Sequence, residues 1–402
     1  MSAPGRPLVT IGHADAPADW NDFVLQCEPA HFEQTSWWAG VESEDGWKSS
    51  YLSMRVAGRL LAGAMVLVRQ QSRFLKVGYV VRGPLIRQEE SESKQVRDCL
   101  ASGLKDLARK HGLTLLVVVP PYEGAALASS LLTSGFLKHP GSLPPTGLSP
   151  ATITVDLRKG IDAVERAYRR TLRQEVNSAR RKGVVVDLGT ANDLGLFWNM
   201  HLQSCLRRGV ATNVPSFDYL CRVWHEFSQE GRAWLFNARL ANDVLCSLLC
   251  LGVGQWFYAW RIGWAPDSKG DHPTQVVFAD AIRKAREAGF QFFDFMQIHP
   301  DDVTMLQRGE PRTTPTAGVT FFKLGFGGSV RTLPPTLDWF PHPAVRLFMR
   351  AIGPRVFASG VPTRLIRRLV GASSTASSGP ARSALRQNVR SSAWHADTLS
   401  PV

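Results

Sequence analysis

A lysine between aromatic residues and a run of glycines is the clearest candidate for chemistry in the sequence. Lys323 lies in the segment 320–328, with two phenylalanines before it and three glycines after it. Aromatic neighbours would remove water from its ammonium group, which could then neutralise an oxyanion or a phosphate. The same pattern also suits a lysine that covers an aromatic cluster beside a turn. We expect the glycines to leave the adjoining backbone mobile.

Two further charged residues stand in apolar or turn contexts. Asp294 lies among phenylalanines in a strand-like run, and a buried carboxylate needs a partner. That partner is either Lys323, an arginine or a substrate amine. Arg82 ends another strand-like run and precedes Gly83-Pro84, so its guanidinium is expected at the rim of a sheet. There it would either bind a phosphate or carboxylate or hold a turn together.

A helix predicted over residues 161–182 carries a basic stripe. Arg166, Arg169, Arg170 and Arg173 are spaced at i, i+3, i+4 and i+7, so they would share one face. Such a stripe either follows a phosphodiester backbone or is a solvated surface. The ten histidines are dispersed and the six cysteines form no CxxC pair, so we predict no metal site.

Hydrophobic periodicity places these residues on two halves of mixed α and β structure. In the first half, strands and helices follow the order β-β-β-α-β-α, and a segment rich in proline, glycine and serine at 137–150 predicts a linker. The second half repeats a similar order, with one strand expected over 244–261. We therefore predict an α/β (α+β) protein with domains at 1–150 and 151–340, followed by an arginine-rich tail at 341–402.

Composition separates the tail from the rest of the chain. The 402 residues have a formal net charge of +13, which favours a polyanionic partner. Residues 341–402 hold nine arginines and one acidic residue, whereas residues 1–340 hold 38 basic and 33 acidic residues. The tail suits either an anionic membrane surface or a helix packed on the body, and residues 371–402 are expected to be disordered. No secretory or membrane-spanning segment is predicted, so a cytoplasmic protein is expected.

The order of these motifs resembles that of the FemABX peptidyltransferases, within the wider group of GNAT-like acyltransferases. The resemblance covers about residues 30 to 330, and Glu175 departs from it where the family usually has asparagine. Glu42 also stands near the position where some members have a phosphate-contacting lysine, which argues against a nucleotide-sugar substrate. The matching segments are 34–38 (QTSWW), 82–84 (RGP), 173–184 (RQEVNSARRKGV), 207–210 (RRGV), 293–295 (FDF) and 322–328 (FKLGFGG).

The resemblance implies two GNAT-like acyltransferase domains with mixed sheets and no cofactor. It implies transfer of an amino acid from aminoacyl-tRNA to an amine of a peptidoglycan precursor or related cell-envelope molecule. Lys323 would stabilise the tetrahedral oxyanion, and no residue stands out as the general base. The implied catalytic residues are Lys323 and Asp294, the substrate-binding residues are Trp37, Arg82, Arg207, Tyr258 and Phe322, and the tRNA-binding residues are Arg169, Arg173 and Arg180.

Two alternatives remain open at the level of the sequence. The first is a GNAT-type N-acyltransferase that uses an acyl-CoA or acyl-carrier donor in polysaccharide or lipid modification. The Gln/Arg-x-x-Gly-x-Gly/Ala motif, whose amides bind pyrophosphate, is absent, which favours the tRNA donor. The second is a non-catalytic module that binds RNA or anionic lipids. If the tail binds a membrane rather than packing on the body, the contact is expected to be peripheral, on the inner face of the cell membrane.

Overall fold

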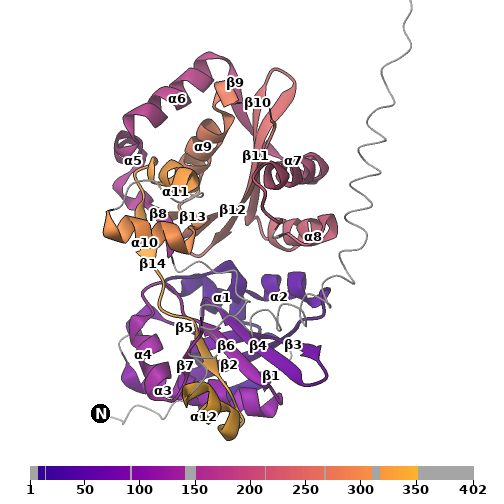
Figure 1. Cartoon of the computed structure of the whole chain (residues 1–402), viewed down its shortest axis with the longest axis vertical. Coiled ribbons are helices and arrows are strands. Elements are labelled where there is room, and N and C mark those ends of the chain that lie inside the picture. Colours follow the sequence, from indigo (N-terminus) through magenta and orange to yellow (C-terminus); the bar gives the residue numbers. More distant parts are fainter. Residues whose placement is uncertain are drawn as a thin grey trace, which may run out of the picture. The chain divides into compact units, whose positions relative to one another are not determined.

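Two mixed β-sheets organise the protein, and helices accompany each of them (Figure 1). The structure is a computed structural model, and it describes residues 8–13, 15–90, 93–140, 151–212, 214–266, 269–309 and 317–351. The predicted α/β class with two mixed sheets is confirmed.

The first sheet has the strand order β1-β2-β3-β4-β6-β15-β7, and β5 pairs with β3. Strands β4 and β6 run parallel, and a crossover helix, α3, connects them, as parallel neighbours require. The strands are β1 (Leu8–His13), β2 (Lys48–Val56), β3 (Arg59–Ser72), β4 (Leu75–Val81), β5 (Leu85–Ile86), β6 (Leu115–Val119), β7 (Leu137–Lys138) and β15 (Leu337–Trp339). The helices are α1 (Trp20–Gln26), α2 (Ser36–Ser43), α3 (Lys94–Lys110) and α4 (Ala125–Thr133), with short 3-10 turns η1 (Phe32–Gln34) and η2 (Gln88–Glu90).

The second sheet has the order β14-β8-β13-β12-β11-β10-β9. Here β12 and β13 are the parallel neighbours, and α9 crosses between them. The strands are β8 (Ala151–Asp156), β9 (Val184–Gly189), β10 (Ala233–Leu240), β11 (Asp243–Val253), β12 (Trp256–Trp264), β13 (Phe292–Gln297) and β14 (Ser329–Thr332). The helices are α5 (Ile161–Ala167), α6 (Arg170–Arg181), α7 (Leu194–Arg207), α8 (Phe217–Ser228), α9 (Pro273–Glu287), α10 (Pro300–Arg308) and α11 (Ala317–Leu324), with 3-10 turns η3 (Leu157–Lys159), η4 (Ala191–Asp193) and η5 (Lys269–Asp271).

Both halves repeat one order of elements. Two helices precede three antiparallel strands, then a crossover helix and a parallel strand: α1-α2-β2-β3-β4-α3-β6 in the first half and α7-α8-β10-β11-β12-α9-β13 in the second. The carboxyl ends of two parallel strands therefore lie side by side in each half, where ligands of open α/β sheets commonly bind. The strand β15 returns to the first sheet after the second half is complete. Domain boundaries at 150 and 340 stay a prediction.

Two predicted elements are wrong in detail. The helix over 161–182 is broken into α5 and α6, because Arg169 has an extended ψ of 141° and its N–H donates to the carbonyl of Gly325 at 2.7 Å. The strand over 244–261 is a hairpin of β11 and β12. Gly254 makes its turn with φ of 57°, and a Cβ there would lie 2.8 Å from the Cβ of Ala30.

One of the apolar cores joins the two halves. It contains Trp20 and Tyr122 from the first half and Phe197, Trp256 and Tyr258 from the second, all buried. Polar groups cross at the same place, since the Trp256 indole N–H donates to a Glu28 carboxylate oxygen at 2.9 Å. Two other cores lie within single halves, between sheet and helices. Burial at this junction stabilises the contact between the two repeated units.

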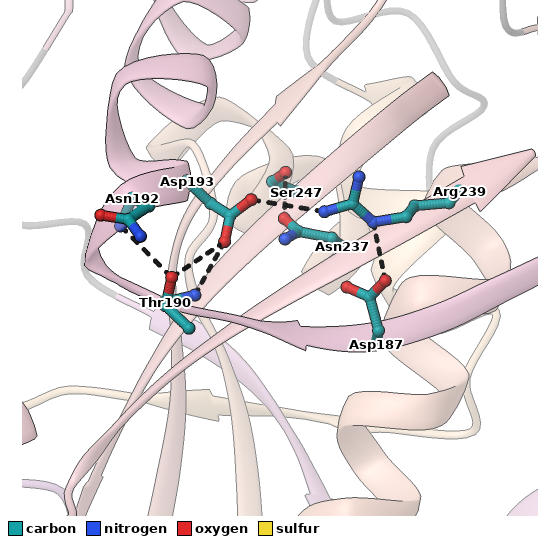
Figure 2. Close-up of polar contacts among 7 residues, drawn as sticks. All are labelled: Asp187, Thr190, Asn192, Asp193, Asn237, Arg239 and Ser247. Atoms are coloured by element: carbon teal, nitrogen blue, oxygen red, sulfur yellow. Dashed lines mark hydrogen bonds and ion pairs between the residues drawn. The ribbon is translucent and has the colours of Figure 1, made fainter. Parts of the chain in front are cut away.

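A polar cluster at the edge of the second sheet fastens β9 to the start of α7 (Figure 2). Arg239 on β10 lies 2.7 Å from Asp187 on β9 and 3.3 Å from Asp193, which precedes α7. Beside it, the hydroxyl of Ser247 donates to the Asn237 side-chain oxygen at 2.6 Å. The cluster thereby sets the position at which α7, the helix that carries Arg207, begins.

The helix α12 (Pro343–Ala351) belongs to a separate unit of the chain and is described by itself. The predicted disorder of 371–402 and most of the predicted linker at 137–150 lie outside the described residues. Within the described ranges, no helix combines the length and the hydrophobicity needed to cross a bilayer.

Candidate active site

The parallel strands β12 and β13 separate at Tyr258 and Asp294. Their paired register covers three residues of each strand and ends at these two positions, although both strands continue. Just beyond, β13 bulges against β8, and Met296 in this bulge has φ of 61°. Bulges interrupt the ladder and redirect backbone groups, and they are common next to active sites. The end of β13 is therefore where backbone carbonyls become available to side chains outside the sheet.

Asp294 holds this bulge in place from inside the protein. It is fully buried, and its Oδ1 accepts the backbone N–H of Met296 at 2.6 Å while its Oδ2 accepts the hydroxyl of Tyr122 at 2.6 Å. The hydroxyl of Thr152 lies between Oδ1 (2.5 Å) and the Met296 carbonyl (2.7 Å). Burial raises the pKa of the Asp294 carboxyl, and these hydrogen bonds and Arg82 oppose that shift. Protein donors thus occupy both oxygens, which is the arrangement of a positioning residue.

Lys323 lies in the last turn of α11 and reaches the carbonyls at the end of β13. Its Nζ donates to the carbonyl of Gln297 at 2.7 Å and lies 3.5 Å from that of Met296. An ammonium has three N–H groups, so at least one is left for a ligand. Burial lowers the pKa of Lys323 to about 8, with Asp294 and Asp302 opposing the shift. The bulge that Asp294 holds therefore also orients the predicted oxyanion-stabilising group.

The glycines after Lys323 serve close packing, which corrects the expectation of a mobile backbone. Gly327 has φ of 74°, and a Cβ there would lie 2.7 Å from the Cβ of Ala167. A Cβ on Gly328 would lie 2.7 Å from a methyl group of Ile153 and 3.0 Å from the Thr154 carbonyl. The end of α11 can approach α5 and β8 only without side chains at these positions, so close packing explains these glycines.

Two of the sequence motifs meet at the end of β4. The side chain of Gln34 accepts the Met65 N–H at 2.9 Å and donates to the Val81 carbonyl at 2.7 Å. A Cβ on Gly83 would lie 2.9 Å from the Gln34 amide, so only glycine fits beside it. Gln34 therefore fixes the turn in which Arg82 adopts a left-handed φ of 56°. Such strain in a non-glycine residue persists where the surroundings enforce it, often at functional sites.

The structure brings four of the predicted site residues together. Lys323, Asp294 and Tyr258 meet at the end of the β12–β13 pair, and Arg82 from the first half lies over the ring of Tyr122 at 4.9 Å. Arg82 is buried. The hydroxyl of Tyr258 donates to the Ala30 carbonyl at 2.5 Å. Burial raises the pKa of Tyr258 well above its usual range.

Three other predicted substrate residues lie elsewhere. Trp37 packs against Phe227, with ring centroids 5.7 Å apart. Arg207 is exposed on α7 and donates to the carbonyl of Trp264. Phe322 is next to Lys323 in sequence, but its ring contacts the rings of Phe278 and Phe326 at 5.5 and 5.3 Å. Their substrate contacts stay predictions.

The predicted tRNA-binding arginines do not share one continuous helix face, because the chain breaks at Arg169. Arg169 and Arg173 are nevertheless both exposed, and the Arg169 guanidinium lies 3.5 Å from the Phe321 carbonyl, close to Lys323 in the chain. Arg180 is in an ion pair with Asp280 at 2.6 Å. Of the three, Arg169 therefore lies beside the segment that carries Lys323, and tRNA binding by all three stays a prediction.

Sequence reasoning missed four residues: Tyr122, His31 and Glu33, which are near Arg82, and Arg261, which is near Glu33. Tyr122 had a usable signal, because Arg82 and Tyr122 each follow one of two parallel neighbours, β4 and β6. Their carboxyl ends must lie at one edge of the sheet. His31 and Glu33 shortly precede the matched segment 34–38, whereas Arg261 had no sequence signal.

Two family models match the chain. The model of the FemAB family matches residues 16–130, and that of the acetyltransferase (GNAT) domain matches residues 166–302. The chain is an acyltransferase, and its residues 16–130 are similar to the FemAB family. No curated protein matches the sequence. The predicted resemblance is thereby confirmed.

Solved structures share the fold of this acyltransferase. The crystal structure of FemX matches with a TM-score of 0.73 and 14% identity, over 85% of this chain and 100% of the FemX chain. A conserved protein of unknown function from Bacteroides thetaiotaomicron VPI-5482 matches with a TM-score of 0.53 and 8% identity, over 82% of this chain and 99% of the other. The FemAB range includes Arg82 and Tyr122, and the GNAT range includes Tyr258 and Asp294. Lys323 lies beyond both ranges, so its role rests on its contacts.

Proposed function

We propose that this acyltransferase moves an amino acid from aminoacyl-tRNA to an amine of a peptidoglycan precursor or a related cell-envelope molecule. The FemAB match supports a peptidoglycan-related aminoacyltransferase at the level of the family. The observation that carries the proposal is the Lys323 ammonium, which is partly desolvated and held by carbonyls where two parallel strands separate. Preorganised positive charge at such a point stabilises an oxyanion that forms in the transition state.

In the proposed reaction, the acceptor amine attacks the ester carbonyl that links the amino acid to the tRNA ribose. A C–N bond forms, and the carbonyl oxygen becomes an oxyanion that an N–H of Lys323 stabilises. The C–O bond then breaks, and the ribose oxygen takes up one proton while the amine loses one. Asp294 acts through Lys323, because it holds the bulge whose carbonyls fix the ammonium. The substrate itself supplies a route for the proton, since the leaving oxygen accepts what the amine releases.

The sequence near α9 supports a tRNA donor over an acyl-CoA donor. Pyrophosphate binds well at a helix N-terminus that follows a glycine-rich loop. The loop before α9 instead places Asp271 close to that terminus, and Lys182 donates to Asp271 at 3.1 Å and to the Gly270 carbonyl at 2.6 Å. A carboxylate near this terminus disfavours a pyrophosphate.

Donor profiling tests the proposal. The full chain is incubated with a lipid-linked cell-wall precursor and either charged tRNAs or acyl-CoAs, and products are identified by mass spectrometry. We expect a mass increase of one aminoacyl residue with charged tRNA alone. Product formed only from acyl-CoA would overturn the tRNA donor and establish the N-acyltransferase alternative.

Charge reversal on Arg169 and Arg173 should weaken tRNA binding. Both side chains are exposed and Arg169 lies beside the helix of Lys323, so each is expected to contact one phosphate. The double variant Arg169→Glu, Arg173→Glu should flatten the slope of log Kd against log salt by roughly 1.5 units, measured by filter binding over a range of salt concentrations. Arg109→Glu is the matched control, because Arg109 is an exposed arginine on α3 of the other half. An unchanged slope in the double variant would return these arginines to an ordinary solvated surface.

We also propose that residues 341–402 bind an anionic membrane surface. On α12, Leu347 and Phe348 are exposed, and Arg346 and Arg350 lie one turn apart on a helix without acidic residues. Apolar groups with arginines suit the boundary between lipid headgroups and acyl chains. Removal of 341–402 should reduce co-sedimentation with vesicles that contain phosphatidylglycerol, and it should spare turnover of a water-soluble precursor. An equal loss of both would show that the tail is part of the fold.

A further inference from the structure

A group of buried N–H donors around Glu33 lacks hydrogen-bond partners among the described residues. The group consists of Nε and Nη1 of Arg82, Nε2 of His31 and Nε of Arg261. They come from the turn after β4, the residue before η1 and strand β12, so both halves contribute. A buried donor without an acceptor destabilises a folded protein. Arg82 and Arg261 both act on the charge of Glu33, and His31 contacts its backbone, so acceptors for these donors would come from outside the described chain.

The backbone hydrogen bond of His31 favours a proton on the nitrogen that lacks a partner. Nδ1 accepts the backbone N–H of Glu33 at 3.3 Å, which favours a neutral ring with its hydrogen on Nε2, and Nδ1 also lies 3.3 Å from an oxygen of the Glu33 carboxyl. Burial and Arg82 lower the pKa of His31 well below its usual range, which keeps the ring neutral. The ring is fixed against Tyr258, with centroids 4.7 Å apart. Nε2–H is therefore a preorganised neutral donor.

The charge of the group suits a singly charged anion. Arg82 and Arg261 supply two positive charges, and burial lowers the pKa of Arg261 only to about 10. Burial raises the pKa of Glu33 to about 7, with Arg82 and Arg261 opposing the shift and Glu42 adding to it. Glu33 therefore cancels part of the positive charge at neutral pH.

Other groups near Arg82 have partners already. The carboxylate of Asp294 and the hydroxyls of Tyr122 and Tyr258 are all engaged in hydrogen bonds. The side chain of Glu33 is 18% exposed.

We infer that Arg82, Arg261 and His31 form a binding site for a carboxylate of the acceptor molecule. A carboxylate offers several acceptor sites to converging N–H groups and carries one charge, whereas a phosphate dianion would exceed the charge that the group provides. The guanidinium of Arg82 stacks on Tyr122, whose hydroxyl holds Asp294 and thus the bulge beside Lys323. Binding at Arg82 would therefore position an acceptor near the reacting carbonyl. The assignment to the acceptor rests on the proposed function, but the carboxylate site does not.

Calorimetric titration of the full chain with N-acetyl-alanyl-alanine and with its C-terminal amide tests the site. We expect the acid to bind at least about ten-fold more tightly than the amide, because a charged hydrogen-bonded contact is lost with the amide. Arg82→Gln should abolish this difference, and Arg59→Gln should leave it unchanged, because the Arg59 side chain is 60% exposed. Inorganic phosphate is the third probe and is expected to compete weakly.

A second variant keeps the test decisive if Arg82→Gln is unstable. His31→Phe retains an aromatic ring but removes Nε2–H, and it should weaken binding of the acid several-fold with little effect on the amide. Equal binding of acid and amide, or no binding of either, would overturn the site. Tighter binding of phosphate would show that it is a phosphate site instead. These measurements need no acyl donor, so failure of tRNA-dependent transfer would leave the result for the carboxylate intact.

Discussion

Replacing Lys323 by methionine is expected to lower kcat about 100- to 1,000-fold, because loss of one oxyanion-stabilising group has this order of effect. Methionine is similar in length and apolar, so the partly buried position stays filled while the charge is lost. The Gln297 carbonyl loses its donor at 2.7 Å, but thermal unfolding should still show a folded protein. Single-turnover rates with charged tRNA and precursor measure the effect on chemistry. Turnover within a few-fold of wild type would exclude the oxyanion role.

The pH profile separates an electrostatic role of Lys323 from a structural one. Only the protonated amine can stabilise an oxyanion, and burial lowers the pKa of Lys323 to about 8. The rate should therefore fall as pH rises above about 8, after any increase in rate that deprotonation of the acceptor amine causes. Lys323→Arg is the matched variant, because a guanidinium stays charged throughout this range. We expect it to be slower than wild type but to lack the fall above pH 8, whereas an unchanged profile would assign that fall to another group.

Local sequence patterns predicted the parts of the site that depend on neighbouring residues. Lys323, Asp294 and Arg82 each stand in a short motif that specifies the local backbone conformation. In the structure the three residues lie in one region. The link between Gln34 and Gly83 shows why two motifs far apart in sequence occur together, since glycine alone fits beside the Gln34 amide. The order of strands and helices was likewise predictable, because hydrophobic periodicity is a property of each segment.

Long-range contacts account for what was missed. Tyr122 and Asp294 are 172 positions apart, so no local pattern could join them. The break in the predicted basic helix depends on a hydrogen bond from Arg169 to Gly325, which the amphipathic spacing of 161–182 does not reveal. The hairpin of β11 and β12 was hidden because both strands are almost wholly apolar around Gly254. Tertiary contacts decided each of these cases.

Replacing Asp294 by alanine is expected to destabilise the protein by about 2–6 kcal/mol and to slow transfer at least about ten-fold. The variant leaves the Met296 N–H and the Tyr122 hydroxyl buried without their acceptor, at about 1–3 kcal/mol each. Thr152 still has the Met296 carbonyl as an acceptor at 2.7 Å, so its hydroxyl adds little to the cost. Chemical denaturation measures the free energy of unfolding. A lower kcat measures the effect of displacing the bulge.

Tyr122→Phe is the matched control for the Asp294 variant, because it removes one donor to the carboxylate and leaves the Met296 contact in place. If Asp294 acts by holding the bulge, Tyr122→Phe should lower stability by roughly 1 kcal/mol and leave kcat near that of wild type. In Asp294→Ala, by contrast, the carbonyls of Met296 and Gln297 are free to shift, and Lys323 shifts with them. The pH profiles should differ in the same way. The fall in rate near pH 8 should shift to a different pH in Asp294→Ala but not in Tyr122→Phe. A large fall in kcat in Tyr122→Phe would instead place the Tyr122 hydroxyl in the proton path, and Asp294 would then act through Tyr122 rather than through the bulge.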